Sequence, residues 1–411
     1  MTRKSEFHPY PNLVHAVAVA AGAAALFCAS GVADASSPFG GPLTEPITGM
    51  AGVVGGTGHT CAVASSGAMY CWGDNVYAQV GDGTSEERWT AVRVIGLGGN
   101  AQSAGAGGSH TCASTSSGAA RCWAYNYHGQ VGDGTDTDRD LPTPVIGLGS
   151  GVQAIATGMI HSCALVNGGV KCWGSNGFGQ LGDGSDTQRL APVQVSGLAS
   201  GVQAIATGGE HSCALTSGGG VKCWGNNDFG QLGNNSTIEQ HTPVDVSGLA
   251  SGVIAISAGR FHTCAITSGG AAKCWGANDN GQLGDNSQTE RHVPVNVSGL
   301  GSGTVSIAAG YAHSCARTGS GGVKCWGGNS WGQLGNGSNS DSPVPVNVNG
   351  LTSGALAIGV GWDHSCAVIG AGRVLCWGSN AYGQLGNDSN TDSAVPVFVL
   401  SSETVFTNGF E

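Results

Sequence analysis

The chain has 411 residues, of which 74 are Gly, 15 are Cys and 10% are charged, with a formal net charge of -11. This acidic balance argues against nucleic-acid binding, which needs clustered Lys and Arg to neutralise phosphates. The low charge, combined with 40% hydrophobic residues, also argues against disorder.

The N-terminal segment has the pattern of a secretory signal. Arg3 and Lys4 precede an apolar run over 13–29, and residues 33–35 form an A-x-A cleavage site. The alternative is a membrane anchor, but the run is short for a span and contains His15. We therefore expect a signal peptide over 1–35, a linker over 36–45, and an exported protein that is extracellular, periplasmic or at the cell surface. No later segment is apolar enough to span a membrane, so we expect no span in the mature chain.

Seven copies of one unit follow, at a period of 50 or 51 residues. Each copy holds a His, then Ser or Thr, then Cys-Ala, and a Cys-Trp about ten residues later. The repeated histidines are His59, His110, His161, His211, His262, His313 and His364. A strict period indicates one supersecondary unit stacked seven times. We place the units at about 46–97, 98–148, 149–198, 199–249, 250–300, 301–351 and 352–400, followed by a C-terminal tail over 401–411.

Each unit contains four short apolar runs separated by Gly, Ser or Asn, which predicts four strands, named A to D in chain order. In the fourth copy these runs are 202–208, 211–216, 221–225 and the stretch that starts at Pro243. No window has a helical period. The units therefore predict an all-β chain of four-stranded antiparallel sheets.

Two cysteines in each copy lie opposite one another across the predicted B–C hairpin. In the third copy the hairpin turns at Asn167-Gly168, a pair that favours a two-residue turn and places Cys163 opposite Cys172. Such non-hydrogen-bonded positions bring Cα atoms to roughly 4.5 Å, which a disulfide can bridge. The alternatives are free buried thiols or metal sites, although no regular fourth metal ligand is present. We predict the disulfides Cys61–Cys71, Cys112–Cys122, Cys163–Cys172, Cys213–Cys223, Cys264–Cys274, Cys315–Cys325 and Cys366–Cys376.

A single sheet of about 50 residues cannot bury both faces, but radial stacking in a seven-bladed β-propeller can. Strand A is rich in small residues, as expected around an axis. Strand D is expected to start with a Pro at 144, 192, 243, 294, 345 and 396, and to be the outermost strand. We expect the repeated Trp rings to pack between blades, with ligand contact as the alternative. We expect the repeated His to be structural, because the motif supplies no carboxylate partner for a general base.

The units H-[ST]-C-A…C-W-G-x-N-x-x-G-Q-[LV]-G resemble the regulator of chromosome condensation repeats, over roughly residues 46–400. Val76-Tyr77-Ala78 in copy one and Ala124 in copy two depart from the pattern. The resemblance implies a seven-bladed propeller. The founding members exchange guanine nucleotide on a small nuclear GTPase, a role that conflicts with an exported chain. Secreted β-lactamase inhibitor proteins of the same fold, which bind a partner enzyme through aromatic loops, are closer in setting.

The A–B and C–D loops emerge on one face of the predicted propeller, and two positions in each A–B loop and one in each C–D loop vary between copies. Large side chains recur there, which is typical of a protein-binding hot spot. The candidate partner-binding residues are Tyr77, His128, Met159, Phe178, Phe229, Arg260, Phe261, Tyr311, Trp331, Trp362 and Tyr382. The alternative is that these rings lie flat on neighbouring loops.

We predict a secreted, non-catalytic propeller that binds another protein, with no cofactor and no metal. The alternatives are a carbohydrate-binding propeller, a regulator resembling the nucleotide-exchange members, or an enzyme with an axial site. No Ser-His-Asp set, phosphate loop or pair of carboxylates recurs at a plausible place. The acidic stretch 133–138 resembles a calcium loop in composition but lacks the terminal Glu, so we interpret it as a turn. Either 42–48 or 404–410 is expected to add a strand across the ring seam; the alternative for the last six residues, 406–411, is an export or attachment tag.

Overall fold

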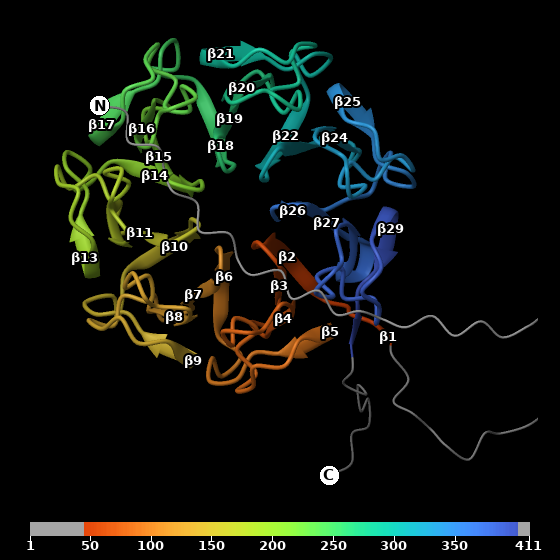
Figure 1. Cartoon of the computed structure of the whole chain (residues 1–411), viewed down its shortest axis with the longest axis horizontal. Coiled ribbons are helices and arrows are strands. Elements are labelled where there is room, and N and C mark those ends of the chain that lie inside the picture. Colours follow the sequence, from red (N-terminus) through yellow and green to blue (C-terminus); the bar gives the residue numbers. More distant parts are fainter. Residues whose placement is uncertain (1–44, 402–411) are drawn as a thin grey trace, which may run out of the picture. The chain divides into compact units, whose positions relative to one another are not determined.

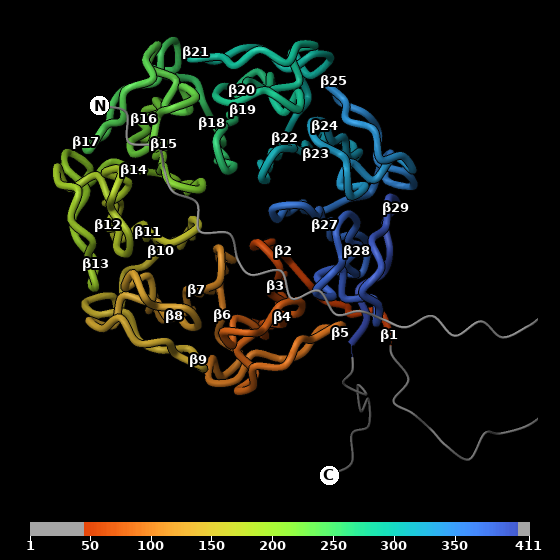
Figure 2. Tube along the Cα trace, in the orientation of Figure 1, coloured from red at the N-terminus to blue at the C-terminus, as the bar shows by residue number. Residues whose placement is uncertain are grey.

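The computed structural model of the chain describes residues 45–401, so the predicted signal peptide and the tail beyond Ser401 lie outside the described residues. Short strands and Gly-rich turns form seven antiparallel sheets that are arranged radially around one axis (Figure 1). The seven-bladed β-propeller predicted from the repeat is therefore confirmed. Figure 2 shows the chain running once around the ring, so that the last blade lies beside the first.

Each blade has four strands, A to D, from the innermost to the outermost. Blade 1 consists of β2 (Met50–Gly55), β3 (His59–Ala64), β4 (Met69–Gly73) and β5 (Arg88–Arg93); blade 2 of β6 (Ala101–Ala106), β7 (His110–Thr115), β8 (Ala120–Ala124) and β9 (Arg139–Pro144); and blade 3 of β10 (Val152–Thr157), β11 (His161–Val166), β12 (Gly169–Gly174) and β13 (Arg189–Gln194). Blade 4 consists of β14 (Val202–Thr207), β15 (His211–Thr216), β16 (Val221–Gly225) and β17 (Gln240–Asp245); and blade 5 of β18 (Val253–Ala258), β19 (His262–Thr267), β20 (Ala272–Gly276) and β21 (Arg291–Asn296). Blade 6 consists of β22 (Thr304–Ala309), β23 (His313–Thr318), β24 (Val323–Gly327) and β25 (Ser342–Asn347); and blade 7 of β26 (Ala357–Val360), β27 (His364–Ile369), the 3-10 turn η1 (Gly370–Gly372), β28 (Arg373–Gly378) and β29 (Ser393–Phe398).

The ring closes at the outer edge of blade 1. Strand β30 (Leu400–Ser401) pairs in parallel with β5, with Ser401 opposite Ala91, and β1 (Glu45–Pro46) pairs antiparallel with β30. The expectation of an added strand from 42–48 is confirmed in β1, whereas 404–410 lies outside the described residues. Both ends of the described chain are therefore fastened to one blade.

Every blade carries the predicted disulfide. Cys163 pairs with Cys172 in the register of β11 and β12, and the turn residue Asn167 has a positive φ of 50°. The seven bridges, all within blades, have Cα–Cα distances of 4.1 Å. The two-residue hairpin brings the cysteines together in blade 3, and the other six blades place theirs opposite one another across a turn that is one residue longer.

The start of the outermost strand differs from the prediction. Strand β13 begins at Arg189, three residues before Pro192, because Arg189 pairs with Gly174 across a bulge in the ladder. In blade 2 the residue equivalent to Pro192 is Pro142, and Pro144 is the last residue of β9. These prolines lie within the edge strand, where the missing N–H is tolerated.

The hydrophobic core is divided into layers between neighbouring blades. One such layer joins the Cys112–Cys122 disulfide, Val131 and Val145 of blade 2 to Ile155 and Trp173 of blade 3. The seven repeated Trp side chains are fully buried. Their predicted role in packing between blades is therefore confirmed.

Candidate functional site

The A–B and C–D loops form one face of the propeller, which we call the loop face. The repeated Asn and Gln hold each C–D loop in place from within. In blade 3 the Asn176 Nδ2 donates to the carbonyls of Ser185 (3.0 Å) and Thr187 (3.1 Å), and its Oδ1 accepts from the Leu181 N–H (2.9 Å). The Gln180 Oε1 accepts from the N–H of Phe178 at 2.9 Å. The loop backbone is therefore fixed, while the side chains it displays are free to differ between blades.

Four blades add an ion pair to this frame, in which Asp82, Asp133, Asp183 and Asp285 contact Arg88, Arg139, Arg189 and Arg291. Burial tends to raise the pKa of Asp183, but hydrogen bonds from Ser185 and Arg189 outweigh it and hold this pKa below its ordinary value. The Asp133 carboxylate is used in the same way by Thr135 and Arg139. The acidic stretch at 133–138 is thus organised as a turn, as predicted.

The repeated His side chains form a closed circuit between blades. Each imidazole Nε2 lies 2.7–3.0 Å from the Ser or Thr hydroxyl of the next blade, and His364 completes the circle on Thr60. The hydroxyl itself donates to the carbonyl of the repeated Gln, as in Ser212 to Gln180 at 3.0 Å. Because that proton is already used, the Ser212 oxygen can only accept here, so His161 donates from Nε2.

Burial sets the ionisation of this circuit. The His161 ring is fully buried, and its Nδ1 has no hydrogen-bond partner within residues 45–401. Burial lowers the pKa of His161 to about 3, because a charged ring would be desolvated. The seven histidines are therefore buried, neutral residues that join the blades, which is the structural role that the sequence predicts.

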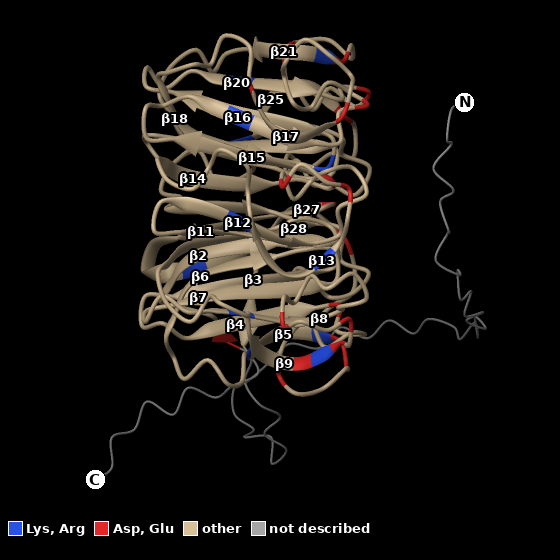
Figure 3. Cartoon of the chain, turned by 90° about the vertical axis from the view of Figure 1, so that its left-hand side faces the viewer, with Lys and Arg blue, Asp and Glu red and all other residues tan. Residues whose placement is uncertain are grey.

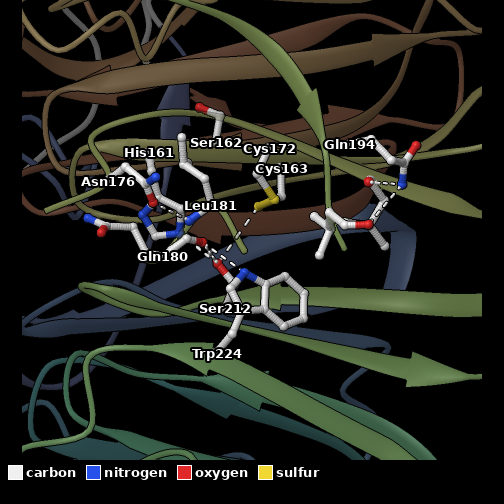
Figure 4. The surroundings of a disulfide bond; sticks show 12 residues. His161, Ser162, Cys163, Cys172, Asn176, Gln180, Leu181, Gln194, Ser212 and Trp224 are labelled. Atoms are coloured by element: carbon white, nitrogen blue, oxygen red, sulfur yellow. Dashed lines mark hydrogen bonds between the residues drawn. A yellow bond between two sulfur atoms is a disulfide. The ribbon is translucent and has the colours of Figure 1, made fainter. Parts of the chain in front are cut away.

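Two groups from the following blade converge on each Gln carbonyl (Figure 4). The Gln180 carbonyl accepts from the Ser212 hydroxyl and from Trp224 Nε1, the latter at 2.9 Å. Gly182 lies against the same indole, and a Cβ added there would stand 2.7 Å from Trp224 Nε1. Each blade therefore locks the next through His, Ser or Thr, Gln and Trp.

The predicted partner-binding residues all lie on the loop face, but their exposure differs. Trp331 is 48% exposed and Tyr382 is 46% exposed. The nine others are half-buried: Tyr77, His128, Met159, Phe178, Phe229, Arg260, Phe261, Tyr311 and Trp362. The alternative that these rings lie on neighbouring loops therefore describes part of the set.

Five of the predicted residues come together around one guanidinium. The carbon Cζ of Arg260 lies 4.6 Å from the ring centroids of Phe261 and Tyr311 and 5.2 Å from that of Trp362. Phe229 extends the group, with its ring centroid 5.0 Å from that of Phe261. Such stacking over aromatic faces stabilises a cation. This Arg260 cluster joins blades 4 to 7 across the loop face.

A second aromatic group spans blades 1 and 2. The ring of Tyr77 lies 4.9 Å from that of Tyr125, and His128 lies between Tyr125 and Tyr127 at 6.5 and 5.1 Å. Tyr125 and Tyr127 were not among the predicted residues, although Tyr127 is 66% exposed. The residue directly after the repeated Asn is exposed in every blade, whereas the residue that follows it, which was the predicted position, is exposed only in blades 6 and 7.

Carboxylates dominate the loop face, as Figure 3 shows along one side of the propeller. The A–B and C–D loops hold 19 of the 22 Asp and Glu residues between positions 45 and 401, namely Asp74, Asp82, Glu86, Glu87, Asp133, Asp136, Asp138, Asp183, Asp186, Glu210, Asp228, Glu239, Asp279, Asp285, Glu290, Asp341, Asp363, Asp388 and Asp392. Arg260 is the one Lys or Arg in the same described loops. Four of these carboxylates are paired with Arg88, Arg139, Arg189 and Arg291 at the starts of the outermost strands, and the others leave the face with a net negative charge.

Three of these carboxylates are partly withdrawn from solvent. Burial raises the pKa of Asp74, Glu210 and Asp363 above the ordinary range. The Arg260 guanidinium opposes this effect at Glu210 and Asp363. Arg260 is thus balanced by aromatic faces and by two nearby acids.

Within residues 45–401 the structure holds no group of three or more His, Cys, Asp or Glu side chains suited to a metal ion. The described part of the chain also has no helix that is long and apolar enough to cross a bilayer.

Comparison with known proteins gives a consistent picture. A family model described as the RCC1-like domain matches residues 105–408, and two models of the regulator of chromosome condensation (RCC1) repeat match residues 51–79 and 66–114. The ultraviolet-B receptor UVR8 of Arabidopsis thaliana is 29% identical over 363 residues, covering 87% of this chain and 71% of that protein. The probable E3 ubiquitin-protein ligase HERC4 of Homo sapiens is 34% identical over 184 residues, covering 44% of this chain and 17% of that protein.

Solved structures share the fold. Human WBSCR16 superposes with a TM-score of 0.72 at 24% identity, covering 81% of this chain and 93% of that chain. Yeast RCC1 (Prp20), solved with Kap60, gives 0.72 at 23% identity, covering 82% and 84%. Together with the seven repeats and the family match over 105–408, the chain belongs to the RCC1-like domain family.

Proposed function

We propose that this chain is an exported, non-catalytic propeller that binds a protein partner through its loop face. One observation carries the proposal. The residues that join the blades repeat almost without change, whereas the side chains that the loop face displays differ from blade to blade. Residues that vary on a fixed frame are suited to recognising an asymmetric partner surface.

The chemistry of the loop face indicates what kind of partner it would take. Exposed Trp331 and Tyr382 offer large, rigid contact areas of the kind that dominates binding energy. The surrounding loops are strongly acidic, so the matching surface is expected to carry Lys and Arg. Lys and Arg side chains also stack favourably on exposed Trp and Tyr rings.

The family supports protein binding as the common role. UVR8 is named as a receptor, and yeast Prp20 has been solved bound to Kap60 and studied for its binding to Gsp1p and histones. The present chain differs in its seven disulfides, which are typical of oxidising compartments. Together with the N-terminal signal pattern, they support an extracellular, periplasmic or cell-surface location.

A non-catalytic role is supported by the state of the repeated histidines. They are buried and neutral, and each Nε2 is used by a hydroxyl of the neighbouring blade. None of them is available as a general base.

The test is capture of a partner from the native extracellular mixture, followed by titration with the purified partner. The double variant Trp331→Ala and Tyr382→Ala should keep the wild-type melting temperature and weaken the affinity at least tenfold. The control Ile254→Ala removes an exposed apolar side chain of β18, away from the loop face, and should bind normally. Raising the salt from 50 to 500 mM should also weaken binding. Wild-type affinity in the double variant would refute the proposal.

A further inference from the structure

A cavity lies between blades 1 and 2, and it breaks the sevenfold pattern of the propeller. It has a volume of about 600 Å³, within the usual size of small-molecule sites. Its wall includes Val54 and Val63 of blade 1 and Ala101 and Ala104 of blade 2. The cavity opens at the turns that carry Gly67 and Asn100, on the face opposite the loop face.

The repeat itself shows which side chains are reduced at this place. The fourth residue of strand A packs against the preceding blade, as Ile155 does against blade 2. The residue at this position is Val53, Ile155, Ile205, Ile256, Ile307 and Ile358 in the other six blades, and Ala104 in blade 2. Blade 2 therefore lacks the branched side chain that fills every other interface.

Two further positions at the same interface are also small. Ala101 is the first residue of its strand, where blades 3, 4 and 5 have Val152, Val202 and Val253, blade 1 has Met50, blade 6 has Thr304 and blade 7 has Ala355. Gly52 stands where blade 3 has Ala154, and a Cβ added to Gly52 would meet nothing within 4 Å. Ala104 and Gly52 are each the smallest residue at their position in the seven blades, whereas Val54 is larger than the Gly, Ala or Ser at its position in the other blades. The cavity therefore coincides with two reductions that are particular to this interface.

The lining combines apolar strand residues with polar residues, which are Gln102 and Ser103 in β6 and Ser65, Ser66, Asn100 and Ser116 at the turns. The strand residues Val54, Val63 and Ala104 contribute hydrocarbon, whereas the turns contribute Ser66 and Asn100. No Asp, Glu, Lys, Arg or His is among the described residues that line it. A charged ligand would lose its hydration there without gaining a counter-charge.

We propose that this cleft binds a small, neutral amphipathic molecule. Its hydrocarbon part would lie against Val54, Val63 and Ala104, and its hydroxyl, ester or amide group would meet Ser66 and Asn100. An apolar occupant would displace water from the hydrocarbon part of this open cleft, which favours binding. The cleft is separate from the loop face. A failure to bind protein at the loop face would therefore leave this proposal unaffected.

The experiment uses n-octanol as a neutral probe, with octanoate and octylammonium as charged probes of equal chain length. Calorimetric titration of the oxidised full chain should show one saturable site for n-octanol. Both charged probes should bind at least tenfold more weakly.

Two variants restore the residues of other blades, Ala104→Ile and Ala101→Val. Each should bind n-octanol at least tenfold more weakly while melting at or above the wild-type temperature. The second variant keeps the test decisive if Ile at position 104 disturbs the fold. Val305→Ala, an exposed strand position outside the cleft, should bind as the wild type does. Absence of a saturable site, undiminished affinity in both filled variants, or equal affinity for the charged probes would overturn the proposal.

Discussion

The histidine circuit predicts an acid sensitivity that can be worked out from its burial. Burial lowers the pKa of His161 to about 3 and that of His364 to about 4, from an ordinary value of 6.5. As the pH falls below 6.5, the histidines of the unfolded chain bind protons, whereas the buried imidazoles of the folded chain do not. Stability is therefore complete above pH 6.5 and is lost progressively as the pH falls from there toward 4 and then 3.

The magnitude is large because the effect repeats seven times. At pH 5 each histidine favours the unfolded state by about 2 kcal/mol relative to pH 7.5. Seven such groups sum to about 14 kcal/mol, which is comparable with the whole stability of an ordinary domain. Asp74, Glu210 and Asp363 act in the opposite direction, because their raised pKa values favour proton uptake by the folded state. They are fewer, so the net effect of acid is destabilising.

The assay is guanidinium unfolding of the oxidised protein, followed by tryptophan fluorescence at several pH values between 7.5 and 5. The free energy of unfolding should fall at a rate that approaches about 1.4 kcal/mol per pH unit for each histidine. His161→Gln should be less stable at neutral pH, and its slope should be smaller by about one seventh. A free energy of unfolding that stays constant from pH 7.5 to pH 5 would refute the assignment of buried, neutral rings.

Three further predictions concern the contacts between blades. Ser212→Ala should lower the free energy of unfolding by about 1–3 kcal/mol, because it leaves the His161 donor without an acceptor. Ser212→Thr should be nearly neutral, since other blades have Thr at this position. Thermal unfolding of both variants tests this prediction. Gly182→Ala should cost more than about 2 kcal/mol in the same assay, because φ is +68° and the new Cβ meets Trp224; a wild-type melting temperature would contradict this. Asp183→Asn should cost at most about 1 kcal/mol, since Arg189 is partly exposed and three other blades have Asn at this position; a larger loss would mean that the ion pair holds the loop.

The fold could be predicted from the sequence because its determinants are local and repeated seven times. The Asn167-Gly168 turn sets the hairpin register, and the register sets the disulfide. The start of strand D could not be found in this way, because the bulge opposite Gly174 depends on a pairing between separate strands. The parallel pairing of Ser401 with Ala91 was hidden for the same reason, since it joins the two ends of the chain.

The candidate site was only partly predictable. The loop positions were identified by their variation. The exposure of their side chains, however, depends on how the repeated Gln holds the backbone two residues before it, as Gln180 holds Phe178. The Arg260 cluster could have been found, because Arg260, Tyr311 and Trp362 are spaced by 51 residues and so occupy equivalent places in consecutive blades. Comparison of the repeats also singles out Ala104, which lines the cavity between blades 1 and 2. The cavity itself could not be predicted from this, because the sequence does not say which side of the strand faces the neighbouring blade.

The seven disulfides each close a hairpin, and none of them crosses from one blade to another. Closure between blades 7 and 1 depends on non-covalent contacts, namely the hydrogen bond between Thr60 and His364, the core layer that contains Trp72 and Leu385, and the two short end strands. The ring could consequently open between blades 7 and 1 while every disulfide stays intact. Thiol counting would register such an opened molecule as fully native, whereas a larger size in solution or the exposure of Trp72 would reveal the opening.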